Sequence, residues 1–195
     1  LEPLACVVHG VDLSQVKSGD LVFVVGAGPI GLLHIQLAKA TGAKTVVVAD
    51  VSPERLRKAA ELGADHAVES RDPVAEVKRR SEDRGADVTI EAVGKPETWE
   101  LAVRATRKGG TTVLFGGCPA GSTASIDTGA VHYGELALKG VFHHTPRDVR
   151  EAMRLISTRQ VKVAPLITHR MKLPQVEAAL RLMQSGAAIK VALTC

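Results

Sequence analysis

The segment at residues 22–31 constrains what this chain can fold into more than any other stretch. An apolar run ends on Gly26, and further glycines follow at Gly28 and Gly31, immediately before a helical pattern. This order is typical of the strand–turn–helix unit that binds a dinucleotide. The first glycine makes the turn, the second lets backbone approach the pyrophosphate, and the third lets helix and strand pack closely. Pro29 suits the first turn of such a helix, where its missing N–H costs nothing.

An acidic residue follows the next apolar run. Residues 45–49 end on Asp50, about 20 residues beyond the first glycine, which is the spacing that ribose binding requires. A carboxylate there accepts hydrogen bonds from both ribose hydroxyls of NAD and repels the 2′-phosphate of NADP. The pattern therefore predicts an NAD site, with NADP as the less favoured cofactor. A strand–helix turn that binds nothing is the alternative interpretation of the glycines.

Strand patterns alternate with helix patterns along the first 145 residues. Helices open on caps such as Ser52 before Pro53, and they close on glycines. Such alternation builds right-handed βαβ units, so we predict an α/β fold of the Rossmann type, a doubly wound parallel six-stranded sheet. We expect the strands at residues 21–25, 45–49, 64–68, 87–94, 111–115 and 136–142. We also expect a short helix at 4–9, loops at 11–20 and 121–134, and a turn at 108–110.

Composition argues against several functional classes. The net charge is +4, but basic residues alternate with acidic ones and aromatic content is 3%, so we expect no nucleic-acid partner. No apolar run approaches the roughly 18 residues of a membrane span, so we expect no membrane partner. Cys6, Cys118 and Cys195 are far apart, which indicates neither a disulfide framework nor a cysteine-based zinc site. A reducing, cytoplasmic setting fits this cysteine usage best.

The pattern changes after residue 145. The remaining residues carry too little apolar surface to form a domain alone. We therefore predict an NAD-binding domain at residues 1–145, with a leading segment at 1–20. The C-terminal segment at 146–195 should pack either on this domain or on a part of the protein outside this sequence.

Five stretches, at residues 2–4, 26–31, 90–94, 165–169 and 189–191, resemble the zinc-dependent medium-chain alcohol and polyol dehydrogenases, most of all the sorbitol and threonine dehydrogenase branch. The resemblance covers the whole chain but only the C-terminal part of that family's usual length. It implies a preceding GroES-like catalytic domain that carries most of the catalytic zinc ligands. We therefore expect zinc in the intact enzyme, and we expect these 195 residues to contain no catalytic residue and to bind no zinc.

The resemblance also implies roles in cofactor binding. Arg55 matches a basic position beside the adenosine ribose, although it could accommodate a 2′-phosphate or be a solvated helix residue. Lys190 matches a residue that reaches the pyrophosphate, with an ordinary edge-strand lysine as the alternative. The predicted cofactor residues are Gly26, Gly28, Pro29, Ile30, Gly31, Asp50, Arg55, Ala92, Val93 and Gly94 on the adenosine and pyrophosphate side, Phe115, Gly116 and Gly117 on the nicotinamide side, and Lys190.

Glu2 is the candidate metal ligand. The resemblance places it at or near the catalytic zinc, so we expect it to act only in the intact enzyme. His143 and His144 also suggest a metal, but adjacent side chains on a strand point to opposite faces, so we predict a poor chelate. His143 could instead line the nicotinamide end of the crevice, and we expect Cys6 to be a small buried residue.

The function that the resemblance implies is the cofactor-binding part of a zinc-dependent oxidoreductase. The intact enzyme would transfer hydride between NAD(H) and a secondary alcohol or polyol, and the 195-residue chain would be inactive alone. Two alternatives stay open: an NADPH-dependent, zinc-free medium-chain reductase, and a non-catalytic dinucleotide-sensing module. We also expect a homo-oligomer formed through the dinucleotide domain, because residues 136–142 could leave an uncovered sheet edge.

Overall fold

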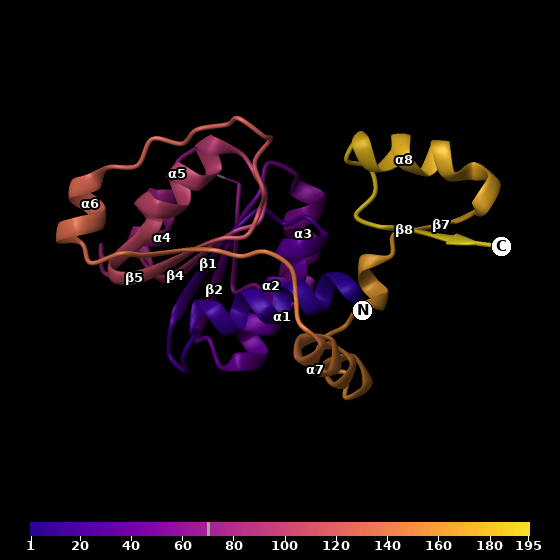
Figure 1. Ribbon diagram of the computed structural model, residues 1–195, viewed down its shortest axis with the longest axis horizontal. Coiled ribbons are helices and arrows are strands. Elements are labelled where there is room, and N and C mark those ends of the chain that lie inside the picture. The colour runs from indigo at the N-terminus through magenta and orange to yellow at the C-terminus, as the bar shows by residue number, and fades with distance from the viewer. Residues whose placement is uncertain (70) are drawn as a thin grey trace. The chain divides into compact units, whose positions relative to one another are not determined.

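The computed structural model describes residues 1–69 and 71–195. The chain forms two compact units, Leu1–Val161 and Lys162–Cys195, and each contains its own sheet (Figure 1). Within the described residues, no helix combines the length and apolar character needed to cross a bilayer.

A six-stranded parallel sheet forms the centre of the first unit. Its strand order is β3-β2-β1-β4-β5-β6, so the chain winds outward from β1 in one direction and then outward from β4 in the other. This confirms the predicted doubly wound fold and places the reversal between β1 and β4, where open α/β sheets bind their ligands. The strands are β1 Leu21–Val25, β2 Thr45–Ala49, β3 His66–Val68, β4 Ala86–Glu91, β5 Thr106–Leu114 and β6 Ala137–Gly140.

Helices cover this sheet, and β1 is buried along its whole length. Burial on both faces is the usual condition of a parallel sheet and explains why β1 and β2 are runs of valine rather than alternating patterns. The predicted caps form: the Ser52 hydroxyl accepts from the Arg55 N–H, and Asp72 accepts from the Ala75 N–H. The helices are α1 Glu2–Ser14, α2 Pro29–Thr41, α3 Pro53–Glu61, α4 Pro73–Arg79, α5 Pro96–Ala105, α6 Thr128–Tyr133 and α7 Pro146–Ser157.

The first helix is longer than the sequence predicted. We expected a helix at residues 4–9 and a loop at 11–20, but α1 continues to Ser14 and ends at Gln15, whose φ is 57°. Gly10 lies between the predicted helix and the predicted loop. A Cβ on Gly10 would come within 2.9 Å of Phe115 Cδ2, so this glycine permits close packing of the helix instead of ending it.

Three other expectations about the first unit were also wrong in detail. The expected turn at residues 108–110 lies inside β5, where the register against β4 shifts between Ala86 and Val88, as at a β-bulge. The expected loop at 121–134 contains α6, which Asp127 caps through the N–H groups of Gly129 and Ala130. The sixth strand ends at Gly140, so residues 141–144 are not part of the sheet.

Helix α7 belongs to the first compact unit, where it packs on α1. An ion pair joins Arg147 to Asp12 at 3.0 Å, and His9 Nδ1 lies 3.5 Å from Asp148 Oδ2. The compact unit thus extends to Val161, beyond the boundary at residue 145 that we predicted. That residues 146–195 also pack on a further domain stays a prediction.

The second unit contains two parallel strands, β7 His169–Lys172 and β8 Val191–Thr194, and helix α8 Val176–Gln184. Two short 3₁₀ turns, η1 Ala164–Leu166 and η2 Leu173–Gln175, complete it. A two-stranded sheet of this size is marginally stable by itself.

Candidate dinucleotide-binding site

The glycine-rich turn lies between β1 and the first turn of α2. Gly26 has a φ of 98°, which side chains rarely tolerate, and its N–H donates to the Ala49 carbonyl at 2.8 Å. A Cβ on Gly31 would collide with the Gly26 carbonyl oxygen, whereas a Cβ on Gly28 would meet nothing within 4 Å. Gly28 also gives α2 no side-chain cap, so the N–H groups of this turn face a space that an anion can enter.

Asp50, directly after β2, is hydrogen-bonded to the glycine turn. Its Oδ2 accepts from the Ala27 N–H at 2.7 Å, and its Oδ1 accepts from the Ser52 N–H at 2.8 Å. Each carboxylate oxygen has a second lone pair, so Asp50 can hold the turn and still accept from a hydroxyl.

A cavity of about 550 Å³ opens at this edge of the sheet. It brings together Gly26, Gly28, Asp50, Arg55, Ala92 and Val93 from the predicted set. Arg71, Lys95, Glu97 and Thr98 line it as well, and sequence reasoning did not find them. Among the described residues, the buried Nε of Arg55 has no hydrogen-bond partner. A ribose hydroxyl or phosphate oxygen would satisfy that donor, so the lining fits a nucleotide.

Glu91, the last residue of β4, organises the neighbouring loops and was also missed. Its side chain is fully buried, and its Oε1 accepts from the Val93 N–H, the Gly94 N–H and the Thr98 hydroxyl at 2.8–2.9 Å. Its carbonyl accepts from the N–H groups of Phe115 and Gly116. An acidic residue between the apolar Ile90 and Ala92, at the end of a strand expected to be buried, is the signal that could have revealed it.

The loops after β4 and β5 approach too closely for side chains. A Cβ on Gly94 would lie 2.5 Å from the Gly117 carbonyl oxygen, and a Cβ on Gly116 would lie 2.7 Å from Glu91 Oε2. The Trp99 indole donates to the Gly116 carbonyl at 2.9 Å, which holds the second loop against α5.

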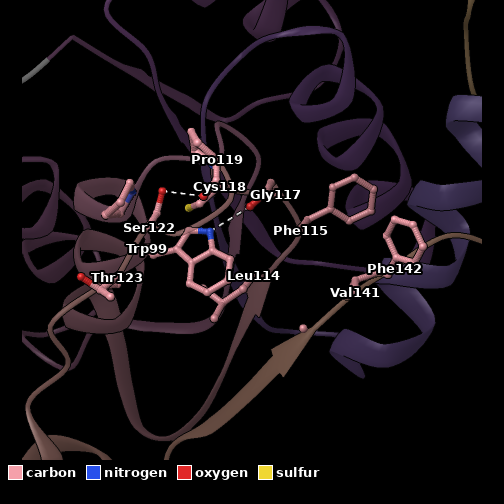
Figure 2. Close-up of a pocket in the computed structure, with 14 residues that line it drawn as sticks. Trp99, Leu114, Phe115, Gly117, Cys118, Pro119, Ser122, Thr123, Val141 and Phe142 are labelled. Atoms are coloured by element: carbon pink, nitrogen blue, oxygen red, sulfur yellow. Dashed lines mark hydrogen bonds between the residues drawn. The ribbon is translucent and has the colours of Figure 1, made fainter.

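A second, largely apolar cavity of about 440 Å³ contains Phe115, Gly116 and Gly117 (Figure 2). Trp99, Cys118 and Phe142 also line it. The rings of Phe115 and His34 pack nearly at right angles, with their centroids 4.7 Å apart. His34 is completely buried in α2, and this burial lowers its pKa to about 3, so the imidazole is neutral. The nicotinamide-side candidates therefore line a different cavity from Asp50.

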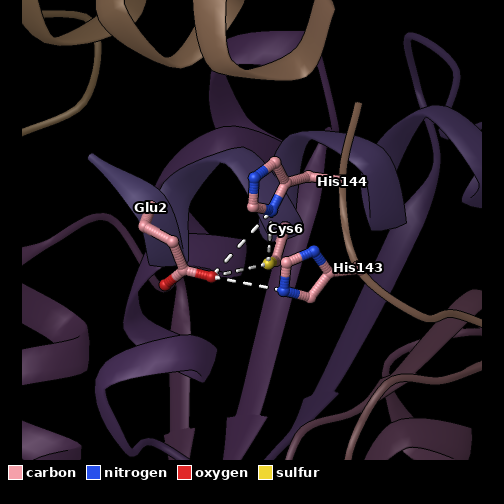
Figure 3. A group of neighbouring side chains, drawn as sticks. All are labelled: Glu2, Cys6, His143 and His144. Atoms are coloured by element: carbon pink, nitrogen blue, oxygen red, sulfur yellow. Dashed lines mark hydrogen bonds and ion pairs between the residues drawn. The ribbon is translucent and has the colours of Figure 1, made fainter. Parts of the chain in front are cut away.

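Glu2 lies beside three other potential metal ligands, Cys6, His143 and His144 (Figure 3). We predicted that the two histidines would point to opposite faces of a strand, and that was wrong. The pair follows β6, His143 has a φ of 71°, and the two rings stack with centroids 4.3 Å apart. Cys6 is only partly buried, and this burial together with the Glu2 carboxylate raises the pKa of its thiol to about 11.

Lys190 precedes β8 in the second unit and is exposed. Its carbonyl accepts from the Thr168 N–H at 3.0 Å, which joins the residues directly before β7 and β8. A role for its ammonium group at the pyrophosphate stays a prediction.

The glycine turn, the acid at the end of β2 and the cavity at the point where strand order reverses define the class of Rossmann dinucleotide-binding domains. Comparison with known proteins gives the family. The zinc-binding dehydrogenase family model matches residues 29–158, and the chain belongs to that family.

Individual relatives agree with this assignment. The chain is 34% identical to sorbitol dehydrogenase of Gallus gallus over 199 residues, which cover 100% of this chain and 55% of that protein. An alcohol dehydrogenase of E. coli CFT073 in complex with NADH matches with a TM-score of 0.90 and 28% identity, covering 100% of this chain and 58% of that one. A structure from Sinorhizobium meliloti 1021, assigned as a zinc-binding dehydrogenase and bound to NADP, matches with a TM-score of 0.88 and 33% identity at the same coverage. The chain thus spans about half the length of the relatives it matches.

Proposed function

We propose that this chain is the NAD(H)-binding part of a zinc-dependent oxidoreductase that acts on a secondary alcohol or polyol. The observation that carries the proposal is the Asp50 carboxylate, which lines the 550 Å³ cavity and is held by the Ala27 and Ser52 N–H groups. The family assignment and the sorbitol dehydrogenase relatives support the alcohol or polyol as substrate class.

The residues of this chain bind and orient the cofactor. The N–H groups at the first turn of α2 would hold the pyrophosphate, and Asp50 would accept from the adenosine ribose. The loops held by Glu91 would support the cofactor beside Ala92 and Val93. The apolar cavity at Phe115 would receive the nicotinamide end. When bound, the nicotinamide supplies the hydride donor or acceptor.

The choice between NAD and NADP rests on two opposed groups. Asp50 disfavours a 2′-phosphate, whereas Arg55 and Arg71 line the same cavity and could pair with one. We propose NAD, because the Asp50 carboxylate is fixed in place by two backbone N–H groups. A preference for NADPH is the second candidate, favoured by the unpartnered Arg55 Nε.

Fluorescence titration with NADH and NADPH tests this proposal. We expect NADH to bind more tightly to the native chain, and we expect Asp50→Asn to weaken NADH binding while narrowing the difference from NADPH. Glu54→Gln is the matched control, because it removes the same charge from an exposed position on α3. Tighter NADPH binding by the native chain would favour the zinc-free reductase, and binding of neither nucleotide would refute the site.

Catalysis requires the part of the protein outside this sequence. Adding an upstream catalytic domain should restore dehydrogenase activity with a secondary alcohol, and NADH binding without activity in the joined protein would favour a dinucleotide-sensing module. We further propose a homo-oligomer, since β6 is the last strand of its sheet and, among the described residues, pairs only with β5. We also propose a cytoplasmic location, which fits the cysteine usage.

A further inference from the structure

Four side chains of metal-ligating type meet on the first compact unit. Glu2 and Cys6 are four residues apart on α1, so they project from the same face of the helix. His143 and His144 come from the segment between β6 and α7 and point toward them (Figure 3). One ligand atom from each residue lies within 4.8 Å of all the others.

The helices that carry this cluster are fixed to each other. Helix α7 begins directly after His144, with Thr145 as its N-cap, and it packs on α1. The His9–Asp148 contact and the Arg147–Asp12 ion pair join the same two helices further along. The cluster therefore rests on packed helices, which favours a preformed arrangement of ligands over a chance meeting of mobile side chains.

The separations match a tetrahedral metal centre. Bonds of about 2.0–2.3 Å from zinc to nitrogen, oxygen and sulfur place neighbouring donors about 3.3–3.8 Å apart. Here Cys6 Sγ lies 3.3 Å from Glu2 Oε1 and 3.3 Å from His144 Nδ1. Glu2 Oε1 lies 3.9 Å from His144 Nδ1 and 4.0 Å from His143 Nε2. Small side-chain adjustments would close the remaining gaps.

We propose that this chain holds one zinc ion by itself, on Cys6 Sγ, His143 Nε2, His144 Nδ1 and the Glu2 carboxylate. The donor set of one sulfur, two imidazole nitrogens and one carboxylate suits zinc and excludes the hard cations calcium and magnesium, which take oxygen ligands. The proposal differs from the expectation that Glu2 serves only a metal held by another domain. It is independent of nucleotide binding.

Zinc titration of the 195-residue chain by calorimetry tests the proposal, together with Co²⁺ absorption spectroscopy. We expect one zinc per chain, a tetrahedral Co²⁺ spectrum and a thiolate-to-cobalt charge-transfer band. Cys6→Ser should abolish that band. His144→Ala should weaken zinc binding by about tenfold or more, since even outer-shell changes at zinc sites cost that much.

Cys195→Ser and His132→Ala are the matched controls, because both residues are exposed and lie outside the cluster. Both should bind zinc as the native chain does. His143→Ala provides a second variant at a half-exposed position, in case Cys6→Ser unfolds the chain, and circular dichroism reports folding in each case. Zinc binding that is undiminished in the Cys6, His143 and His144 variants, or absent from the folded native chain, would overturn the proposal.

Discussion

Two replacements of Glu91 should show how much of its contribution to stability comes from the hydrogen bonds that its Oε1 accepts. In Glu91→Ala, three hydrogen bonds to Oε1 disappear, and the Gly94 N–H is left buried without a partner. Hydrogen bonds of this kind contribute about 1 kcal/mol each, and an unpaired buried donor costs about 1–3 kcal/mol. We therefore expect Glu91→Ala to lower the free energy of unfolding by about 3–5 kcal/mol, since a cavity is also created.

Glu91→Gln should cost far less. Its amide oxygen can accept from the same three donors, and only the Oε2 position changes, which is buried and unpartnered among the described residues. Urea unfolding followed by circular dichroism measures the three proteins, with Glu54→Ala as the exposed control at about 0.5 kcal/mol or less. An Ala variant as stable as the native chain, or a Gln variant as unstable as the Ala variant, would refute the assignment of Oε1 as the organising atom.

Three further predictions follow from the same geometry. Gly31→Ala should lower unfolding stability by about 1–3 kcal/mol in a urea titration, because its Cβ collides with the Gly26 carbonyl. Gly28→Ala should leave that stability nearly unchanged but weaken NADH binding in a fluorescence titration, because its Cβ would stand in open space where the pyrophosphate approaches. His34→Leu should flatten the acid dependence of stability: the folded pKa of about 3 lies below the ordinary 6.5, so the native chain loses stability as pH falls from 6.5 toward 3. Unfolding free energies measured across that range check the sign, and equal slopes for both proteins would contradict it.

Local sequence patterns were sufficient to predict most strands of the sheet and most helix starts. The runs of valine in β1 and β2 and the cap–proline pairs at Ser52 and Asp72 require only neighbouring residues, and the structure confirms them. The errors arose where a distant contact decides the conformation. The sequence predicted a helix that stops at residue 9, but α1 continues through Gly10, which packs closely against Phe115.

Prediction of the candidate site from the sequence was limited in the same way, by contacts between distant residues. The glycine turn and Asp50 were found because their spacing along the chain is fixed by the βαβ unit. Glu91 was missed because its partners, the Val93 and Gly94 N–H groups, are backbone atoms of a loop. No spacing of residue types along the chain predicts the conformation of that loop. The positive φ of His143 likewise depends on how the segment after β6 crosses to α7, so the grouping of the two histidines with Cys6 could not be read from sequence.

The two backbone hydrogen bonds to Asp50 link cofactor choice to loop integrity. The same carboxylate that would accept hydrogen bonds from the ribose also holds the Ala27 N–H in the glycine turn and the Ser52 N–H at the start of α3. A substitution that admits a 2′-phosphate at this position therefore also loosens the pyrophosphate-binding turn. Engineering this chain toward NADP consequently requires paired changes, one that removes the negative charge and another that supplies a new acceptor for the Ala27 N–H.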